Sequence, residues 1–232
     1  MQNRIAFKLW GRYALFTDPI TRVGGEKCSY HLPTYEAIKG VLKSIYWKPT
    51  LIWYVDKLRI MKPLQTQTKG IKPLVWSGGN SLAIYNFLHQ VEYQIEAHFE
   101  WNMHRPSLAH DRIEGKHFNI AQRMLAKGGR QDIFLGTRDC PGYVEPCVFG
   151  ENESPFDNIN ELGFGLMFHG FDYPDETGSD ELHSRFWHPV LRKGILEFPR
   201  PEQCCIRKFV RTMKAKEFLP GENFSLANEE ES

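Results

Sequence analysis

Apolar and polar residues alternate along several stretches of this chain, a pattern typical of β-strands that have one buried face. The alternation is clearest from Gln90 to Trp101, where every second residue from Val91 onward is aliphatic or aromatic. A shorter alternating run covers residues 4–10, and residues 51–61 are rich in β-branched and aromatic side chains, so both are predicted to be strands. Residues 143–149 predict a fourth strand, at an edge of the sheet, because a proline within it lacks the amide hydrogen that a central strand donates.

Apolar residues recur at helical spacing in two further stretches. The first covers residues 34–47, with Thr34 as the N-cap residue and Pro49 blocking continuation. The second covers residues 111–127 and ends at a pair of glycines. The order strand, helix, strand, strand, helix, strand predicts an α+β fold with a ferredoxin-like (RRM-like) arrangement, in which both helices cover one face of the sheet.

The remaining segments carry weaker patterns. Residues 62–81 are polar and punctuated by proline and glycine, which predicts a loop or a strand extension. Beyond residue 150 we expect, in order, an acidic linker (151–161), a strand (162–173), an acidic loop (174–184), a short helix ending at Gly194, strands at 195–198 and 204–210, and a disordered tail from Glu222. These features divide the chain into a ferredoxin-like domain of residues 1–150 and a small β-rich domain of residues 151–232.

The charge is uneven, although the formal net charge is only +1. Residues 1–75 contain thirteen Lys or Arg and four acidic residues, whereas residues 150–184 contain nine acidic residues and neither Lys nor Arg. Such asymmetry indicates a half of the molecule that faces a polyanion, and the alternative is an ordinary solvated surface.

Composition also limits the kind of protein. A 232-residue chain with 41% hydrophobic residues forms a sizeable core, and no stretch approaches the roughly 20 apolar residues of a membrane span. The N-terminal apolar run is too short for a signal peptide, so we expect a cytoplasmic protein. The five cysteines contain no CxxC pair, which favours buried thiols over disulfides or a zinc site.

Three residues with acid, base or charge-stabilising potential fall where the two predicted helices face each other. Tyr46 continues the edge of the first apolar stripe, where its phenol is expected to reach solvent. His117 lies on the apolar stripe of the second helix, and Lys116 is displaced by about 100° around that helix. Each residue also has an ordinary explanation, since histidine on an apolar stripe is usually a satisfied core residue, and such a tyrosine and lysine usually pack or lie in solvent.

This combination fits RNA cleavage without a metal ion. A base removes the proton from the ribose 2′-hydroxyl, an acid protonates the departing 5′-oxygen, and a cation stabilises the charge on the phosphorane. The pattern leaves open whether Tyr46 or His117 is the base. The start of a helix favours the neutral form of His117 and also attracts phosphate.

Several long motifs resemble one family. They are FKLWGRYALFTDP (7–19), VGGEKCSYHLPTYEAIKG (23–40), SIYWKPT (44–50), EGKHFN (114–119) and LGFGLMFHGFDY (162–173). The chain resembles the pre-crRNA-processing endoribonucleases of type I-C (Dvulg) CRISPR systems, members of the RAMP superfamily that are also subunits of the interference complex.

The resemblance implies a ferredoxin-like domain with a small β-rich domain and cleavage of the CRISPR repeat at the base of its hairpin. This reaction needs no metal or cofactor and leaves a 2′,3′-cyclic phosphate and a 5′-hydroxyl. The family's catalytic tyrosine, lysine and histidine correspond to Tyr46, Lys116 and His117. The resemblance also implies that the protein stays on the 5′ handle of its product and joins the backbone and large subunits. A non-catalytic subunit that only binds the handle is the alternative.

Further RNA contacts are expected from basic residues near the helix ends or on the polar strand face. They are Lys8, Arg12, Lys48, Arg105 and Arg112. Any of them is equally compatible with ordinary surface charge.

Overall fold

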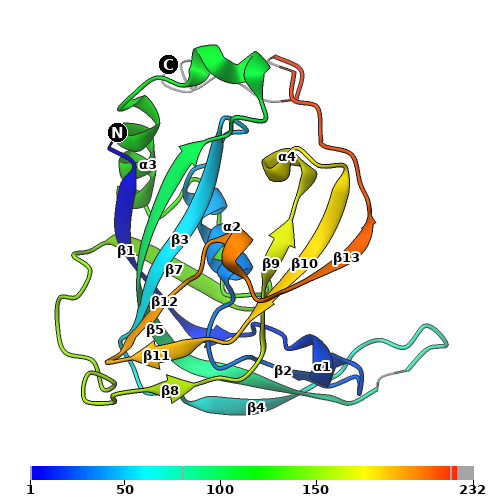
Figure 1. The fold of residues 1–232 in the computed structure, drawn as a ribbon. Helices are drawn as coiled ribbons and strands as arrows, with labels where there is room; N and C mark the ends of the chain where they lie inside the picture. Colours follow the sequence, from blue (N-terminus) through cyan, green and yellow to red (C-terminus); the bar gives the residue numbers. More distant parts are fainter. Residues whose placement is uncertain (1, 80, 220, 224–232) are drawn as a thin grey trace.

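The computed structural model describes residues 2–79, 81–219 and 221–223 (Figure 1). Most of the tail that was expected to be disordered, residues 224–232, lies outside this range. The larger elements are β1 (Arg4–Ala14), α2 (Tyr35–Ile45), β3 (Leu51–Ile60), β4 (Thr66–Ile71), β5 (Ala83–Trp101), α3 (Lys116–Ala126), β7 (Pro141–Pro146), β9 (Met167–Asp172), β10 (Glu181–Trp187) and β13 (Ile206–Thr212). The short ones are α1 (Pro19–Arg22), β2 (Lys27–Cys28), the 3₁₀ helix η1 (Pro106–Asp111), β6 (Ile133–Phe134), β8 (Leu162–Gly163), α4 (Pro174–Thr177), β11 (Val190–Arg192), β12 (Ile195–Glu197) and η2 (Pro201–Gln203).

The predicted ferredoxin-like arrangement is confirmed. The four strands of the motif lie in the order β7-β1-β5-β3 and all neighbours are antiparallel. Directly paired residues point to the same face, and the row formed by Phe7, Ile95 and Leu58 is fully buried. The fourth strand, β7, begins two residues earlier than expected. Strand β6 pairs with its first two residues, Pro141 and Gly142, so Pro146 lies beyond that pairing, where β7 is the edge of the sheet.

Helix α2 forms as its sequence predicts. The Thr34 hydroxyl accepts a hydrogen bond from the amide of Ala37 at 3.1 Å, and the apolar stripe is buried against the sheet. Helix α3 starts at Lys116, and the expectation that it begins near Asp111 was wrong. Gly115 has a φ of +78°, which interrupts the helix, and Asp111 ends the separate 3₁₀ helix η1.

The C-terminal half adds strands in two places. Strands β12, β11 and β8 extend the main sheet beyond β3, and β9, β10 and β13 form a second sheet that lies on the other side of α2 in Figure 1. The helix expected to end at Gly194 is wrong, because its residues form β10 and β11. Strand β10 buries Leu182, Arg185 and Trp187 between two neighbouring strands, and this pairing outweighs the helical spacing of a few apolar residues. The acidic loop begins with the short helix α4.

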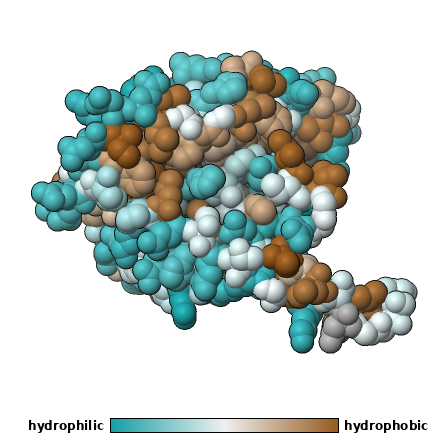
Figure 2. Space-filling model, turned by 90° about the horizontal axis from the view of Figure 1, so that it is seen from below, coloured by the Kyte–Doolittle hydropathy of each residue, from teal (hydrophilic) through white to brown (hydrophobic). Residues whose placement is uncertain are grey.

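Residues 62–81 include β4, which pairs with an extension of β5 that the alternation had not revealed. The β4–β5 hairpin projects from the molecule (Figure 2). Leu74 and Trp76, in the loop between its strands, are exposed. No helix in the described part of the chain is long and apolar enough to cross a membrane.

Candidate active site and adjoining cavity

The C-terminal end of α2 turns Tyr46 into the protein. The amide of Tyr46 still donates to the carbonyl of Leu42 at 2.9 Å, but its φ of −161° is extended, and its carbonyl accepts from Nε1 of Trp53 at 2.8 Å. The chain therefore bends from α2 toward β3 at this residue. Tyr46 is fully buried, so the expectation that its phenol reaches solvent was wrong.

His117 is the second residue of α3 and meets Tyr46 in the interior. Nε2 of the imidazole lies 2.7 Å from the backbone carbonyl oxygen of Asp111, and Nδ1 lies 2.8 Å from the hydroxyl of Tyr46. A carbonyl oxygen only accepts, so Nε2 carries the proton. In the neutral imidazole Nδ1 is then an acceptor, and the Tyr46 hydroxyl donates to it.

Burial is the largest influence on the charge of His117. It lowers the pKa of the imidazole below its ordinary value, and the nearby ammonium groups of Lys116 and Lys48 lower it further. The contacts with Asp111 act in the opposite direction without reversing the shift. The lowered pKa agrees with the expected neutral histidine, and desolvation is its main cause.

Asp111 is a member of this group that the sequence reasoning missed. Its buried carboxylate accepts a hydrogen bond from Thr50 at 2.7 Å and lies 3.3 Å from Nζ of Lys116. Oδ2, the oxygen that accepts from Thr50, also lies 3.4 Å from Nε2 of His117, whereas Oδ1 is the oxygen near Lys116. The available signal is its position six residues before His117, but the helical spacing places Asp111 in the first turn of the predicted helix. Thus the structure brings Tyr46, Lys116 and His117 together and adds one carboxylate, with Lys116 only 16% exposed.

The five expected RNA contacts separate into three groups. Lys48 and Arg105 line a cavity beside Tyr46. The guanidinium of Arg112 instead donates to the backbone carbonyls of Asn102 and Arg105 at 2.8 and 2.9 Å and stabilises the loop between β5 and η1. Lys8 and Arg12 are both on β1 and do not line the cavity. Lys8 pairs with Glu145 on β7, and the guanidinium of Arg12 lies 5.3 Å from the ring of Tyr13.

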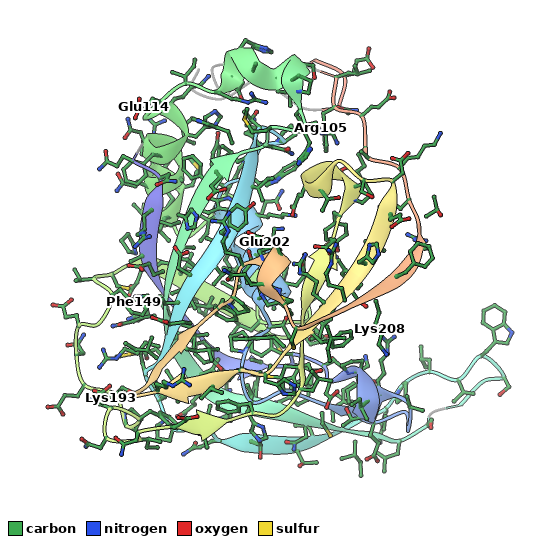
Figure 3. The ribbon with its side chains drawn as sticks, viewed as in Figure 1. Arg105, Glu114, Phe149, Lys193, Glu202 and Lys208 are labelled. Atoms are coloured by element: carbon green, nitrogen blue, oxygen red, sulfur yellow. The ribbon has the colours of Figure 1, made fainter. Side chains whose placement is uncertain are left out.

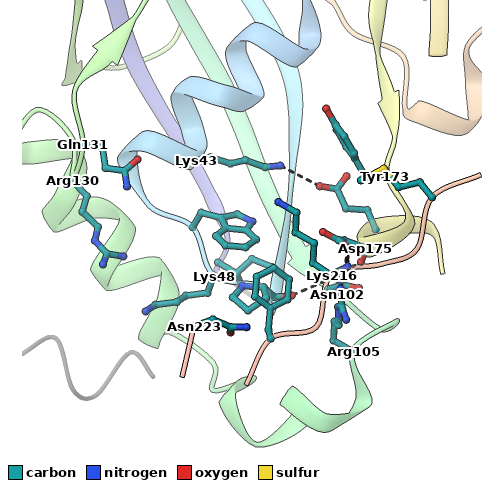
Figure 4. A pocket seen from close by; sticks show the side chains of 16 residues that line it. Lys43, Lys48, Asn102, Arg105, Arg130, Gln131, Tyr173, Asp175, Lys216 and Asn223 are labelled. Carbon is teal, nitrogen blue, oxygen red and sulfur yellow. Dashed lines mark hydrogen bonds and ion pairs between the residues drawn. The ribbon is translucent and has the colours of Figure 1, made fainter. Parts of the chain in front are cut away.

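The cavity has a volume of about 720 Å³ and lies beside the C-terminal end of α2 (Figure 4). Its walls come from α2, the segment after β5, the turn after α3, helix α4 and the chain after β13. Arg105 and Glu114, on the segments before η1 and α3, lie at this same end of the molecule (Figure 3). Among the described residues, no group of three or more His, Cys, Asp or Glu side chains is arranged to hold a metal ion.

Fold and site together define an α+β protein with a ferredoxin-like sheet, a β-rich C-terminal extension and a Tyr-Lys-His group where its two main helices meet. Comparison with protein families gives the particular assignment. The Cas_Cas5d family model, described as CRISPR-associated protein (Cas_Cas5), matches residues 4–199, so the chain belongs to this family. The resemblance noted in the sequence is thereby confirmed.

Individual relatives agree with the family. Two curated relatives carry the name CRISPR pre-crRNA endoribonuclease Cas5d. The protein from Mannheimia succiniciproducens is 27% identical over 86% of this chain and 96% of its own length, and that from Thermus thermophilus is 28% identical over 84% and 91%. A crystal structure of a CRISPR-associated protein has a TM-score of 0.76 at 31% identity, covering 88% of this chain and 96% of the other. The structure of the functionally uncharacterized SMU1763c from Streptococcus mutans has a TM-score of 0.74 at 33% identity over the same shares.

Proposed function

We propose that this chain is an endoribonuclease that cleaves the CRISPR repeat hairpin of pre-crRNA without a metal ion. The hydrogen bond between the Tyr46 hydroxyl and Nδ1 of His117 is the observation that carries the proposal, because it joins an acid to a base beside the Lys116 ammonium. The names of the two curated relatives support the same substrate and reaction.

In the proposed reaction the 2′-hydroxyl passes its proton to the Tyr46 oxygen while Tyr46 passes its own proton to Nδ1 of His117. The 2′-oxygen forms a bond to phosphorus, and the bond from phosphorus to the 5′-oxygen breaks. Lys116 stabilises the phosphorane charge and donates the proton that the 5′-oxygen requires. The products are a 2′,3′-cyclic phosphate and a 5′-hydroxyl, and solvent then restores the two protonation states.

The reaction requires contact between RNA and a pair that is buried in this structure. Lys48 links the two places, since it lines the cavity and also contributes to the low pKa of His117. The proposal therefore includes a rearrangement of the side chains between the cavity and Tyr46 when RNA binds. The protein would act in the cytoplasm, retain the 5′ handle and join the backbone and large subunits of the interference complex.

Two substrates and one variant test this function. Cleavage of a repeat hairpin should proceed in excess chelator and stop when the nucleotide before the cut is 2′-deoxy. His117→Ala should bind the hairpin with unchanged affinity and fail to cut it. Dependence on added metal, or cleavage of the deoxy substrate, would contradict the mechanism, and full activity of His117→Ala would exclude the assigned site.

A second function, a non-catalytic subunit that binds the 5′ handle, is favoured by one observation. Tyr46 and His117 have no solvent-exposed surface, as expected of residues that only hold α2 and α3 together. This function predicts tight binding of the hairpin with no cleavage by the unaltered protein, under conditions that include its partner subunits.

A further inference from the structure

The cavity beside Tyr46 has an aromatic interior. The rings of Trp47 and Phe218 meet edge to face with centroids 5.6 Å apart. The guanidinium of Arg105 lies 5.2 Å from the ring of Phe218, and Nζ of Lys43 lies 6.0 Å from that of Trp47. Aromatic rings flanked by cations are the surfaces on which proteins stack unpaired nucleic-acid bases.

The charge of the lining favours an anion. Five basic residues and two acidic ones line the cavity, the basic ones being Lys43, Lys48, Arg105, Arg130 and Lys216. The two carboxylates are already engaged, because Asp175 lies 3.0 Å from Arg105 and Glu176 pairs with both Lys39 and Lys43. The excess of positive charge is what a phosphate group requires.

The C-terminal segment 213–219 crosses this cavity. It follows β13 and has no helix or strand of its own. The amide of Met213 donates a hydrogen bond to the carbonyl of Asp180 at 2.9 Å, and the amide of Lys216 donates to the carboxylate of Asp175 at 2.7 Å. The ring of Phe218 packs against that of Trp47. Such a segment separates from the body at a lower free-energy cost than a core strand does.

We propose that this cavity is a subsite for one unpaired nucleotide next to the cleaved phosphate, and that Phe218 occupies the position of its base until RNA binds. The base then stacks on Trp47, and the phosphate is bound by Lys48 and Arg105. Trp47 directly follows Tyr46, which places the subsite one residue from the reacting pair. The cavity volume of about 720 Å³, with segment 213–219 in place, is within the range of ligand sites, and departure of that segment enlarges it. The inference rests on the proposed function in taking RNA as the ligand and the phosphate beside Tyr46 as the one that is cleaved; stacking of a base on Trp47 does not depend on cleavage.

The test measures binding separately from cleavage. The probe is a fluorescent repeat hairpin that is 2′-deoxy before the cut, either with its single-stranded flanks or trimmed to the stem and loop. Trp47→Ala should weaken binding of the flanked hairpin about 10-fold, in the range measured for single stacked bases, and leave the trimmed hairpin unchanged. Trp47→Tyr retains a stacking ring and should restore most of the affinity.

Phe218→Ala should strengthen binding of the flanked hairpin several-fold, because the competing ring is gone. Phe209→Ala removes an exposed phenylalanine of β13 outside the cavity and serves as the matched control, with no change expected. Weaker binding by Phe218→Ala would contradict the proposal that Phe218 competes with the base. An equal loss of affinity by Trp47→Ala for both hairpins would contradict the proposal that the cavity binds an unpaired nucleotide. A protein that shows the binding pattern but never cuts RNA refutes the proposed catalysis and leaves the subsite standing.

Discussion

The hydroxyl of Tyr46 donates a hydrogen bond to Nδ1 of His117, and the two residues are fully buried although 71 positions separate them in the sequence. The carbonyl of Asp111 fixes this direction of donation by accepting from the opposite ring nitrogen. The hydroxyl of Tyr46 is therefore oriented to transfer its proton to Nδ1 of His117.

Tyr46→Phe should separate the role of the hydroxyl from the role of the ring. The variant keeps the packing but leaves Nδ1 of His117 buried without its donor, which costs roughly 1–3 kcal/mol of unfolding free energy. Cleavage should fall by a factor of about 100 or more, the usual contribution of a positioned proton-transfer group. Single-turnover cleavage and urea unfolding on the same samples check both effects. An active Tyr46→Phe protein would remove the phenol from the mechanism.

Charges around His117 should move the acidic limb of the pH–rate profile in opposite directions. Asp111 raises the pKa of His117 and Lys48 lowers it. Asp111→Asn should therefore keep the imidazole neutral at lower pH and shift the limb downward, whereas Lys48→Gln should raise the pKa and shift the limb upward.

The profile should be measured as the single-turnover rate at saturating RNA, so that a weaker affinity of Lys48→Gln does not enter. Shifts of the same sign in both variants would show that another group controls the limb.

The motif strands and α2 could be read from the sequence because each has a local pattern that agrees with its tertiary environment. The β5 alternation and the Thr34 cap are examples. The start of α3 was misplaced because helical apolar spacing does not reveal that Gly115 has a positive φ. The exposure of Tyr46 was misjudged for a related reason, since the direction of a residue just past a helix end depends on where the chain goes next.

The remaining errors arise from contacts between distant parts of the chain. Asp111 joins the site through Thr50, 61 positions earlier, and no periodicity encodes that hydrogen bond. Strand β12 pairs with β3 across more than a hundred residues, for example Leu196 with Leu58. The three candidate site residues were chosen from motif and helix position, and neither feature indicates the carboxylate of Asp111 beside them.

His169 should make the protein sensitive to acid. It is fully buried against Tyr35, with ring centroids 4.1 Å apart, and burial together with Arg185 lowers its pKa to about 3. The unfolded chain binds this proton near pH 6.5, so stability is present above that pH and is lost as the pH falls toward 3. Between pH 7 and pH 5 the loss from this one group is about 2 kcal/mol.

His169→Gln retains a donor and an acceptor at this position and carries no titratable group. Its unfolding free energy, measured in urea at pH 7 and pH 5, should fall by about 2 kcal/mol less than that of the unaltered protein. The raised pKa of His98, caused by its hydrogen bond with Asp56, acts in the opposite direction but is common to both proteins and cancels in the comparison. Equal pH dependence in the two proteins would show that His169 is not buried in its neutral form.

Two glycine-to-alanine substitutions should have opposite effects on stability. Gly115 precedes Lys116 and His117 with a φ of +78°, and a Cβ there would meet nothing within 4 Å, so only the backbone conformation opposes alanine. Gly115→Ala should cost roughly 1–3 kcal/mol and displace the start of α3, which lowers cleavage through the position of His117. Gly40 lies inside α2, also with open space around its Cβ, and Gly40→Ala should stabilise the protein by about 0.4–1 kcal/mol and leave cleavage unchanged. If Gly115→Ala were as stable and active as Gly40→Ala, the positive φ would not be what positions His117.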